Sequence, residues 1–287
     1  MKIKTTLCIS YFLLNLMDSS ITFVSAQLGA KASKTTKIVP HSYLMKNEDY
    51  GEVDHTKFNI DLSLQVMNLA VNKGIAQGID RWMKIIVGDL PDVDNTDGSY
   101  SGNSCTAIPY PSVVDDIYLC VLELEIDGEG DDCGCNILGF FDYNSVRPDT
   151  GLLFEGAVFF DTYDAARLLR QPGHWEAFIL RYMGYAIGFS QLLLVDGPTD
   201  YIPGNPTLTY IGENGRRVWQ QEWGCSGNPP LIVDYSNFGF ATGYWDSACI
   251  VNELFADHVN LTGKLSKLTI AAFEDMGYEV DYSAADQ

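Results

Sequence analysis

The hydrophobic period changes between residues 58 and 87, and this change constrains the fold more than any other feature. From 58 to 66 apolar residues alternate with polar ones, which predicts a half-buried strand. From 67 to 87 the apolar residues recur every three or four positions, which predicts an amphipathic helix that ends at Pro91. A strand leading directly into a long helix indicates a domain in which a helix covers a sheet.

Four later segments carry similar signals. Two are predicted strands, at 117–126 and 156–161, and two are predicted helices, at 178–188 and 266–276. Gly277 follows the last helix as a stop signal. No internal repeat is visible, and a chain of 287 residues is long enough for one domain with two lobes and a cleft between them.

The N-terminus has the pattern of a secretory signal. Lys2 and Lys4 precede an apolar core at 7–17, and Val24-Ser-Ala26 is a small-residue cleavage site. A membrane anchor is the alternative, but the apolar run is too short to span a bilayer. We expect a signal peptide at 1–26, a flexible lead-in at 27–56 and a secreted, extracellular chain without a transmembrane segment.

Six cysteines lie beyond the signal, and an even number in an exported chain favours disulfides. Cys225 with Cys249 is the preferred pair, because both fall in the C-terminal third. The other four allow several pairings. A metal site at Cys133-Gly-Cys135 is less favoured, since zinc sites space their cysteines more widely. The six are Cys105, Cys120, Cys133, Cys135, Cys225 and Cys249.

The chain is strongly acidic, with a formal net charge of −20. Nucleic acid is therefore an unexpected partner, because phosphate binding needs a basic surface. The segment Asp127 to Asp132 is acidic enough to hold calcium, but it lacks EF-hand spacing and an ordinary acidic turn is favoured. Asn260-Leu-Thr262 is a glycosylation sequon and predicts a surface position.

The predicted helix at 178–188 carries the spacing of a zinc-peptidase helix without its chemistry. In H-E-x-x-H the two histidines hold zinc and the glutamate is the base. Here Arg181 and Tyr185 stand at the histidine positions and Tyr182 at the glutamate position. Gly188 follows where metzincin peptidases turn the chain toward a third ligand.

The surrounding chain resembles the leishmanolysin-like zinc peptidases, of the metzincin type, over residues 58 to 286. The resemblance implies an α+β, metzincin-like fold. In that fold a mixed twisted sheet and long helices form an N-lobe at about 57–189, and a smaller, loop-rich C-lobe covers about 190–287. The matching blocks are 58–62 with 76–92, 156–164, 244–255, and 265–278 with 284–286.

In the same resemblance, Tyr244 takes the third ligand position and Phe255 the Met-turn position. All expected zinc ligands and the base are then absent. Tyrosine binds metal only as phenolate, with a reference pKa near 10, and arginine has no acceptor atom. Tyr182 is a poor base at neutral pH. The sequence predicts an inactive homologue of a zinc metalloendopeptidase, with no cofactor.

An active metalloendopeptidase with unusual ligands is the alternative, using His174 with Tyr185 or Tyr244. The histidines are scattered, at 41, 55, 174 and 258, and no two have helical spacing. Glu253 and Asp257 are i, i+4 neighbours near the Met-turn position, and we interpret both as structural.

A peptide- or protein-binding cleft is the function that the resemblance favours. Its edge strand would pair with a peptide backbone through Gly156, Ala157 and Val158. Arg181 would bind a carboxylate, from Glu253 or from a ligand. A structural interpretation stays open, with packing tyrosines and a solvated arginine. The predicted cleft floor consists of Tyr182, Tyr185, Tyr244 and Trp245.

Overall fold

The computed structural model describes nine stretches of the chain, all within the compact unit that runs from Pro40 to Gln287. They form an α+β fold with a mixed sheet. The predicted signal peptide, most of the predicted lead-in, Asn260 and Cys105, Cys133 and Cys135 lie outside these stretches. The described residues are 43–44, 54–66, 68–98, 110–127, 137–189, 198–200, 209–234, 242–257 and 261–287.

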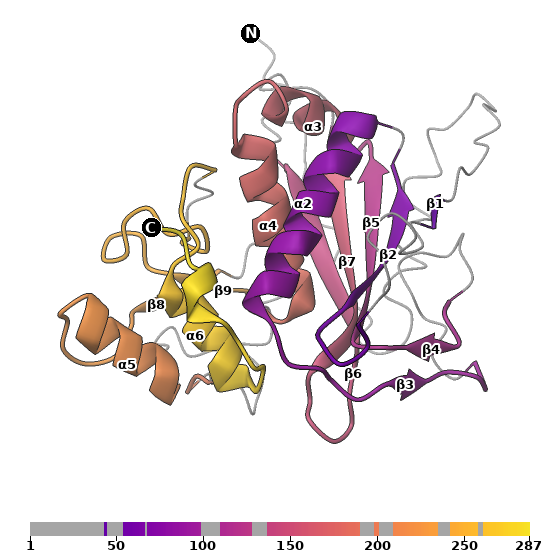
Figure 1. The fold of residues 1–287 in the computed structure, drawn as a ribbon. Helices are drawn as coiled ribbons and strands as arrows, with labels where there is room; N and C mark the ends of the chain where they lie inside the picture. The colour runs from indigo at the N-terminus through magenta and orange to yellow at the C-terminus, as the bar shows by residue number, and fades with distance from the viewer. Residues whose placement is uncertain are drawn as a thin grey trace, which may run out of the picture. The chain divides into compact units, whose positions relative to one another are not determined.

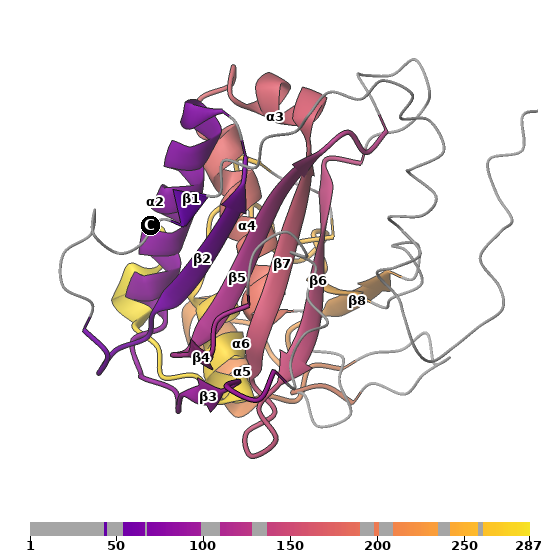
Figure 2. The same ribbon diagram turned by 90° about the vertical axis from the view of Figure 1, so that its right-hand side faces the viewer.

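The main sheet has the strand order β1-β2-β5-β7-β6 (Figure 2). Strands β2, β5 and β7 run parallel, while β1 and β6 are antiparallel to their neighbours at the two ends. The bounds are Tyr43–Leu44 for β1, Ile60–Gln65 for β2, Ile117–Leu124 for β5, Leu153–Asp161 for β7 and Gly139–Val146 for β6. The predicted strands at 58–66, 117–126 and 156–161 are confirmed.

Two long helices, α2 (Leu69–Ile85) and α4 (His174–Ile187), lie side by side over one face of this sheet (Figure 1). The indole of Trp82 donates from α2 to the carbonyl of Leu180 at 2.9 Å. That of Trp175 donates from α4 to the carbonyl of Val71 at 3.2 Å. Each buried indole therefore has a partner on the other helix, which fixes the pair.

The helix predicted at 67–87 is confirmed, but its predicted end at Pro91 is wrong. Helix α2 ends at Ile85, and Ile86 is already extended and bridges to Val280. Pairing with the C-terminal segment therefore ends the helix before the proline is reached.

The short helix α3 (Thr162–Leu168) follows β7 and is capped by Asp161, whose carboxylate accepts two backbone N–H bonds.

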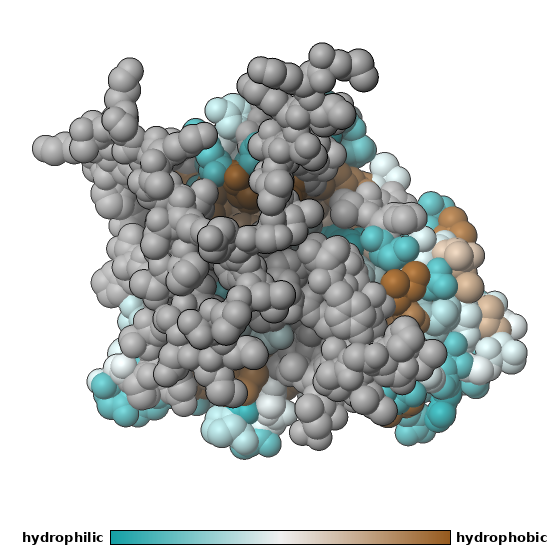
Figure 3. Space-filling model, turned by 180° about the vertical axis from the view of Figure 1, so that it is seen from behind, coloured by the Kyte–Doolittle hydropathy of each residue, from teal (hydrophilic) through white to brown (hydrophobic). Residues whose placement is uncertain are grey.

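The other face of the sheet carries smaller apolar groups. One joins Cys120, Leu122, Ala157 and Phe159, and the other joins Val114, Tyr118 and Phe154. A short ribbon of β3 (Val93–Asp94) and β4 (Val113–Val114) lies beyond the start of β5. From the side opposite to Figure 1, the described surface shows hydrophilic residues with small hydrophobic areas between them (Figure 3).

The C-terminal part consists of α5 (Glu213–Glu222), a hairpin of β8 (Leu231–Asp234) and β9 (Thr242–Trp245), α6 (Lys267–Met276) and the 3-10 turn η4 (Tyr282–Ala284). The helix predicted at 266–276 is confirmed. Ser266 caps its first turn, and Gly277 ends it with a φ of 111°, in the left-handed region that favours glycine.

The prediction that residues 156–158 form an edge strand is wrong. Gly156, Ala157 and Val158 lie in β7, which pairs with β5 on one side and β6 on the other, so they offer no open edge to a peptide. A Cβ atom at position 156 would lie 2.3 Å from the carbonyl oxygen of Ala186. Glycine is therefore needed there for the close approach of α4 to the sheet.

The predicted Cys225–Cys249 disulfide is also wrong in this structure, where both are free thiols and Cys249 is exposed. Cys120 is disulfide-bonded, and its partner is not among the described residues. None of the described helices combines the length and apolar character that a membrane span requires.

Candidate functional site

Helix α4 carries the three motif positions predicted at 181, 182 and 185. The helix predicted at 178–188 is confirmed, although it begins earlier, at His174. Arg181 and Tyr185 are each only 2% exposed, whereas Tyr182 is half-buried. The interpretation of Arg181 as a solvated charge is therefore wrong, and Tyr185 is part of the core.

The structure brings Arg181, Tyr185 and Tyr244 together, and we call these three the arginine–tyrosine cluster. The guanidinium carbon of Arg181 lies 5.6 Å from the ring centre of Tyr185 and 5.4 Å from that of Tyr244. The two tyrosine rings are 5.7 Å apart. Phe255, which the sequence resemblance assigns to the Met-turn position, lies 5.2 Å from the ring of Tyr185. Positions matched separately along the chain thus meet at one place.

Arg181 has no carboxylate partner within the described chain. Its guanidinium donates to the backbone carbonyl of Leu254 and otherwise faces the two tyrosine rings. The predicted pairing with Glu253 is wrong. The Glu253 carboxylate instead accepts from the backbone N–H of Ser266 at 3.1 Å and from the hydroxyl of Thr269 at 2.6 Å.

The cluster does not fit a zinc ion. A guanidinium has no acceptor atom and keeps its positive charge, so Arg181 excludes a cation from the position it fills. Burial raises the pKa of Tyr185 well above its usual value and that of Tyr182 to about 12. Phenolate, the only form of tyrosine that ligates metal, is therefore strongly disfavoured at neutral pH.

The alternative ligand set does not assemble either. His174 is the first residue of α4, and Tyr185 lies three turns further along the same helix. Eleven residues of α-helix correspond to about 16 Å, which is far beyond the span of one metal site. His174 therefore cannot share a metal with Tyr185.

The predicted cleft floor of four aromatic residues is only partly correct. Trp245 is fully buried, and its indole N–H donates to the Thr269 hydroxyl at 2.8 Å. Tyr185 is equally enclosed, and Tyr244 is 7% exposed. Only Tyr182 reaches the surface to a significant extent, and its ring lies 4.3 Å from that of Phe178. Three of the four residues are core, because their rings fill the space between α4 and the C-terminal part.

The edge strand next to this cluster is β6, which the sequence signals did not predict. Phe141 of β6 stacks on Tyr185 with ring centres 4.7 Å apart and an interplanar angle of 11°. The sheet edge and the arginine–tyrosine cluster are therefore in direct contact. Strand β6 is last in the sheet order and pairs with β7 through one side only, as far as the described residues show.

The register identifies the backbone groups that β6 directs away from β7. The N–H of Asp161 donates to the carbonyl of Leu138 at 3.0 Å, so these two residues form a hydrogen-bonded pair. Hydrogen-bonded and non-bonded pairs alternate in an antiparallel ladder. The N–H and C=O groups of Gly139 and Phe141 consequently point outward, whereas the outward N–H of Tyr143 donates to the carboxylate of Asp142 at 2.9 Å.

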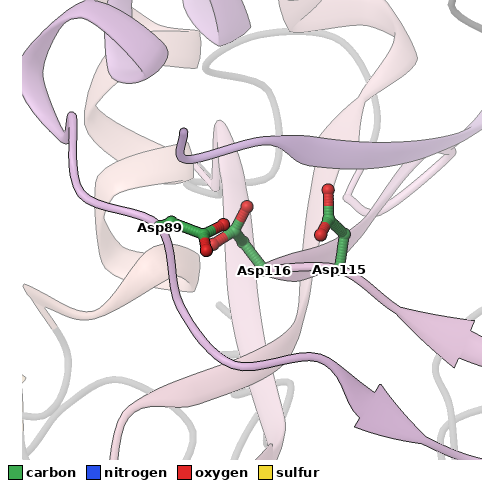
Figure 4. A group of neighbouring side chains, drawn as sticks. All are labelled: Asp89, Asp115 and Asp116. Carbon is green, nitrogen blue, oxygen red and sulfur yellow. The ribbon is translucent and has the colours of Figure 1, made fainter. Parts of the chain in front are cut away.

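An acidic group outside this site lies at the start of β5. Oxygen atoms of Asp89, Asp115 and Asp116 lie within 4.8 Å of one another, and Figure 4 shows the carboxylates of Asp89 and Asp116 next to each other with that of Asp115 to one side. Asp116 accepts the backbone N–H groups of Asn59 and Leu90, both at 2.6 Å. These bonds tie two loops to β5 and give the buried carboxylate a structural role.

A second acidic group includes Asp127, the first residue of the predicted calcium segment. It lies near Asp161, the cap of α3, and Asp164, which binds Arg167. Asp127 accepts the backbone N–H of Ile137 at 2.9 Å. Residues 128–132 lie outside the described part of the chain, so calcium binding there stays a prediction.

Comparison with known proteins leaves the family open. No protein-family model matches the chain, and no curated protein is similar to it. The function is therefore inferred from the arginine–tyrosine cluster and the neighbouring sheet edge.

Proposed function

We propose that this protein is a secreted, catalytically inactive relative of the leishmanolysin-like, metzincin-type peptidases, and that it binds peptide or protein segments in extended form. The observation that carries the proposal is the meeting of Arg181, Tyr185 and Tyr244 above Phe255. The sequence resemblance places these residues at the zinc-ligand and Met-turn positions, and it does so from separate blocks of the chain. Blocks matched by chance would have no reason to converge on one spot.

Inactivity follows from the chemistry of the same residues. Arg181 has no atom that can bind a metal ion. The pKa of Tyr182 near 12 means that its hydroxyl cannot act as a base at the position where the family has its glutamate. Without metal and base, water is not activated for attack on a peptide bond. The alternative, an active metalloendopeptidase, would need ligands that the described residues do not bring together.

The proposed binding element is β6 rather than β7. A peptide that adds to a sheet edge gains affinity from main-chain hydrogen bonds, and these are independent of zinc. The outward N–H and C=O groups of Gly139 and Phe141 supply such bonds. Because Phe141 stacks on Tyr185, a peptide on this edge would lie beside the arginine–tyrosine cluster.

A reversion experiment tests the peptidase frame. The variant Arg181→His, Tyr182→Glu, Tyr185→His and Tyr244→His should bind near-stoichiometric zinc, measured by elemental analysis after desalting. A matched variant that keeps Arg181 and carries the other three changes should not, because the guanidinium still fills the site. A folded fourfold variant without zinc uptake would contradict the frame, as would stoichiometric zinc in the unmodified protein.

A pair of changes at Phe141 tests the binding edge. Phe141→Pro removes one outward N–H, whereas Phe141→Ala removes the same side chain and keeps that N–H. An acetylated, amidated peptide of serine, threonine and valine serves as the extended probe. The proline variant should bind it several-fold more weakly than the alanine variant, by fluorescence anisotropy. Equal affinities would exclude pairing at this edge.

A further inference from the structure

Arg181 is a buried cation for which the described chain supplies no counter-ion. The residue is 2% exposed, and one guanidinium N–H group donates to the carbonyl of Leu254. Among the described residues, no ion pair or further hydrogen bond involves this side chain. By contrast, the other fully buried arginine, Arg147, donates to the carbonyls of Pro91, Leu153 and Asp116.

Within the described part of the chain, the carbonyl of Leu254 is the one hydrogen-bond acceptor of the Arg181 guanidinium, which has five N–H donors. Arginine remains protonated in proteins, so burial cannot be relieved by loss of the proton. The faces of the Tyr185 and Tyr244 rings offset part of the lost hydration through cation–π attraction. Ring faces do not accept the in-plane N–H bonds, however. The acceptor that matches two parallel N–H groups is a carboxylate.

The residues around Arg181 indicate how such a ligand would reach the guanidinium and which other groups it would contact. Tyr182 follows Arg181 on α4 and is half-buried, so it connects the enclosed cluster with the surface. The guanidinium carbon lies 5.6 Å from the ring centre of Tyr185. Burial raises the pKa values of the Tyr182 and Tyr185 hydroxyls, and the charge of Arg181 partly offsets this increase. Phenol hydroxyls are donors that can share a bound carboxylate with arginine.

We propose that Arg181 is the receptor for a carboxylate of the bound peptide, either the C-terminal carboxylate or that of an acidic side chain. The inference rests on the proposed function for the nature of the ligand. The sequence allows two sources for a carboxylate partner of Arg181, namely Glu253 and a ligand. The Glu253 carboxylate is already hydrogen-bonded to Ser266 and Thr269. Peptides that place a carboxylate beside β6 are then preferred over neutral ones.

The test is an NMR titration of the full chain labelled with 15N, followed through the arginine Nε–Hε signals. The signal of Arg181 is assigned by its absence in Arg181→Lys, and that of Arg167, which already binds Asp164, is the internal control. The probes are acetate and three acetylated peptides of serine, threonine and valine. One has a free C-terminus, one an internal glutamate with a C-terminal amide, and one neither.

Acetate and at least one acidic peptide should shift the Arg181 signal and leave that of Arg167 unchanged. The free-carboxylate and glutamate peptides distinguish the two sources of the carboxylate. Arg181→Met should weaken binding of the preferred acidic peptide at least tenfold, without changing affinity for the neutral one. Because the titration is performed on the unmodified chain, the result does not depend on the folding of that variant.

The failures of the two proposals are distinguishable. If the peptides shift the backbone signals of Phe141 and Tyr143 while Arg181 is unmoved, the receptor role is overturned and binding at the edge stands. If acetate shifts Arg181 but no peptide perturbs β6, the carboxylate site stands and the peptide function fails. An equal response of Arg181 to the neutral peptide also overturns the receptor role.

Discussion

Gly156 offers the sharpest test of how β7 and α4 are arranged. In the structure this residue belongs to a strand that is paired on both sides, and its missing side chain is what lets α4 approach. Gly156→Ala would place a Cβ atom 2.3 Å from the carbonyl oxygen of Ala186 and 3.2 Å from its Cβ. An ordinary contact needs about 3.4 Å or more. The helix backbone would therefore have to move away from the sheet.

The expected cost follows from what the new atom meets. Overpacking a core typically costs about 1–3 kcal/mol, and values near the upper end apply where the obstacle is backbone rather than a flexible side chain. We therefore expect Gly156→Ala to lower the free energy of unfolding by about 3 kcal/mol. Since α4 carries Arg181 and Tyr185, the same shift should reduce the near-ultraviolet circular dichroism of the aromatic core.

Urea unfolding followed by tryptophan fluorescence measures this effect. Gly224→Ala is the matched control, because a Cβ atom there meets nothing within 4 Å and adds only the backbone cost of a φ of 65°. That cost is about 1–2 kcal/mol. A loss for Gly156→Ala no larger than that of the control would refute the close packing of β7 against α4.

Three further outcomes are expected in the C-terminal part. Burial raises the pKa of Glu253 to about 7. Because the folded pKa exceeds the unfolded one, the contribution of Glu253 to stability is complete below about pH 4. It is lost as the pH rises through about 7, by up to about 3 kcal/mol, and urea midpoints at pH 5 and pH 8 should show a loss that Glu253→Gln removes. Thr269→Val leaves the indole of Trp245 and the Glu253 carboxylate without this hydroxyl, and calorimetry should show a loss of about 2–4 kcal/mol. A thiol reagent should modify exposed Cys249 in the native protein faster than Cys225, whereas a Cys225–Cys249 peptide in a non-reducing digest would contradict the free thiols.

Elements with strong local signals could be predicted from the sequence. The alternation in β2 and the helical period of α2 depend on which side chains face the core, and the order of apolar and polar residues in the sequence shows this directly. The same holds for the ends of α6, where Ser266 accepts from the backbone of the first turn and Gly277 adopts a positive φ. In these cases a few neighbouring residues decide the structure.

The place of a strand within the sheet could not be predicted as readily, because it depends on distant partners. Strand β6 contains Phe140, Asp142 and Tyr143 without clear alternation, and its register shifts near Ser145. A usable signal was present in β7. All of its residues except Glu155 and Asp161 are apolar or glycine, and a nearly continuous apolar run of this kind is typical of a strand that is covered on both faces.

In the candidate site, too, local patterns could be predicted from the sequence, whereas contacts between distant residues could not. Helical spacing was enough to bring positions 181 and 185 onto one face, and the resemblance added Tyr244. Whether the cluster would be open or enclosed depends on how side chains from α4, β6 and the C-terminal part fill their shared space. The stacking of Phe141 on Tyr185 and the bond from Arg181 to Leu254 involve residues far apart in the chain. No local pattern encodes such contacts.

The chemistry of the cluster also explains how the proposed frame can lose its metal and keep its fold. A zinc site requires ligand atoms within about 0.2 Å of ideal distances. Ring stacking and cation–π contacts tolerate much larger displacements, so Arg181 and Tyr185 can join α4 to Tyr244 without that accuracy. The junction is then stable but no longer shaped for a reaction. Outward backbone donors on β6, and a guanidinium without a carboxylate partner among the described residues, are what the proposed binding function requires.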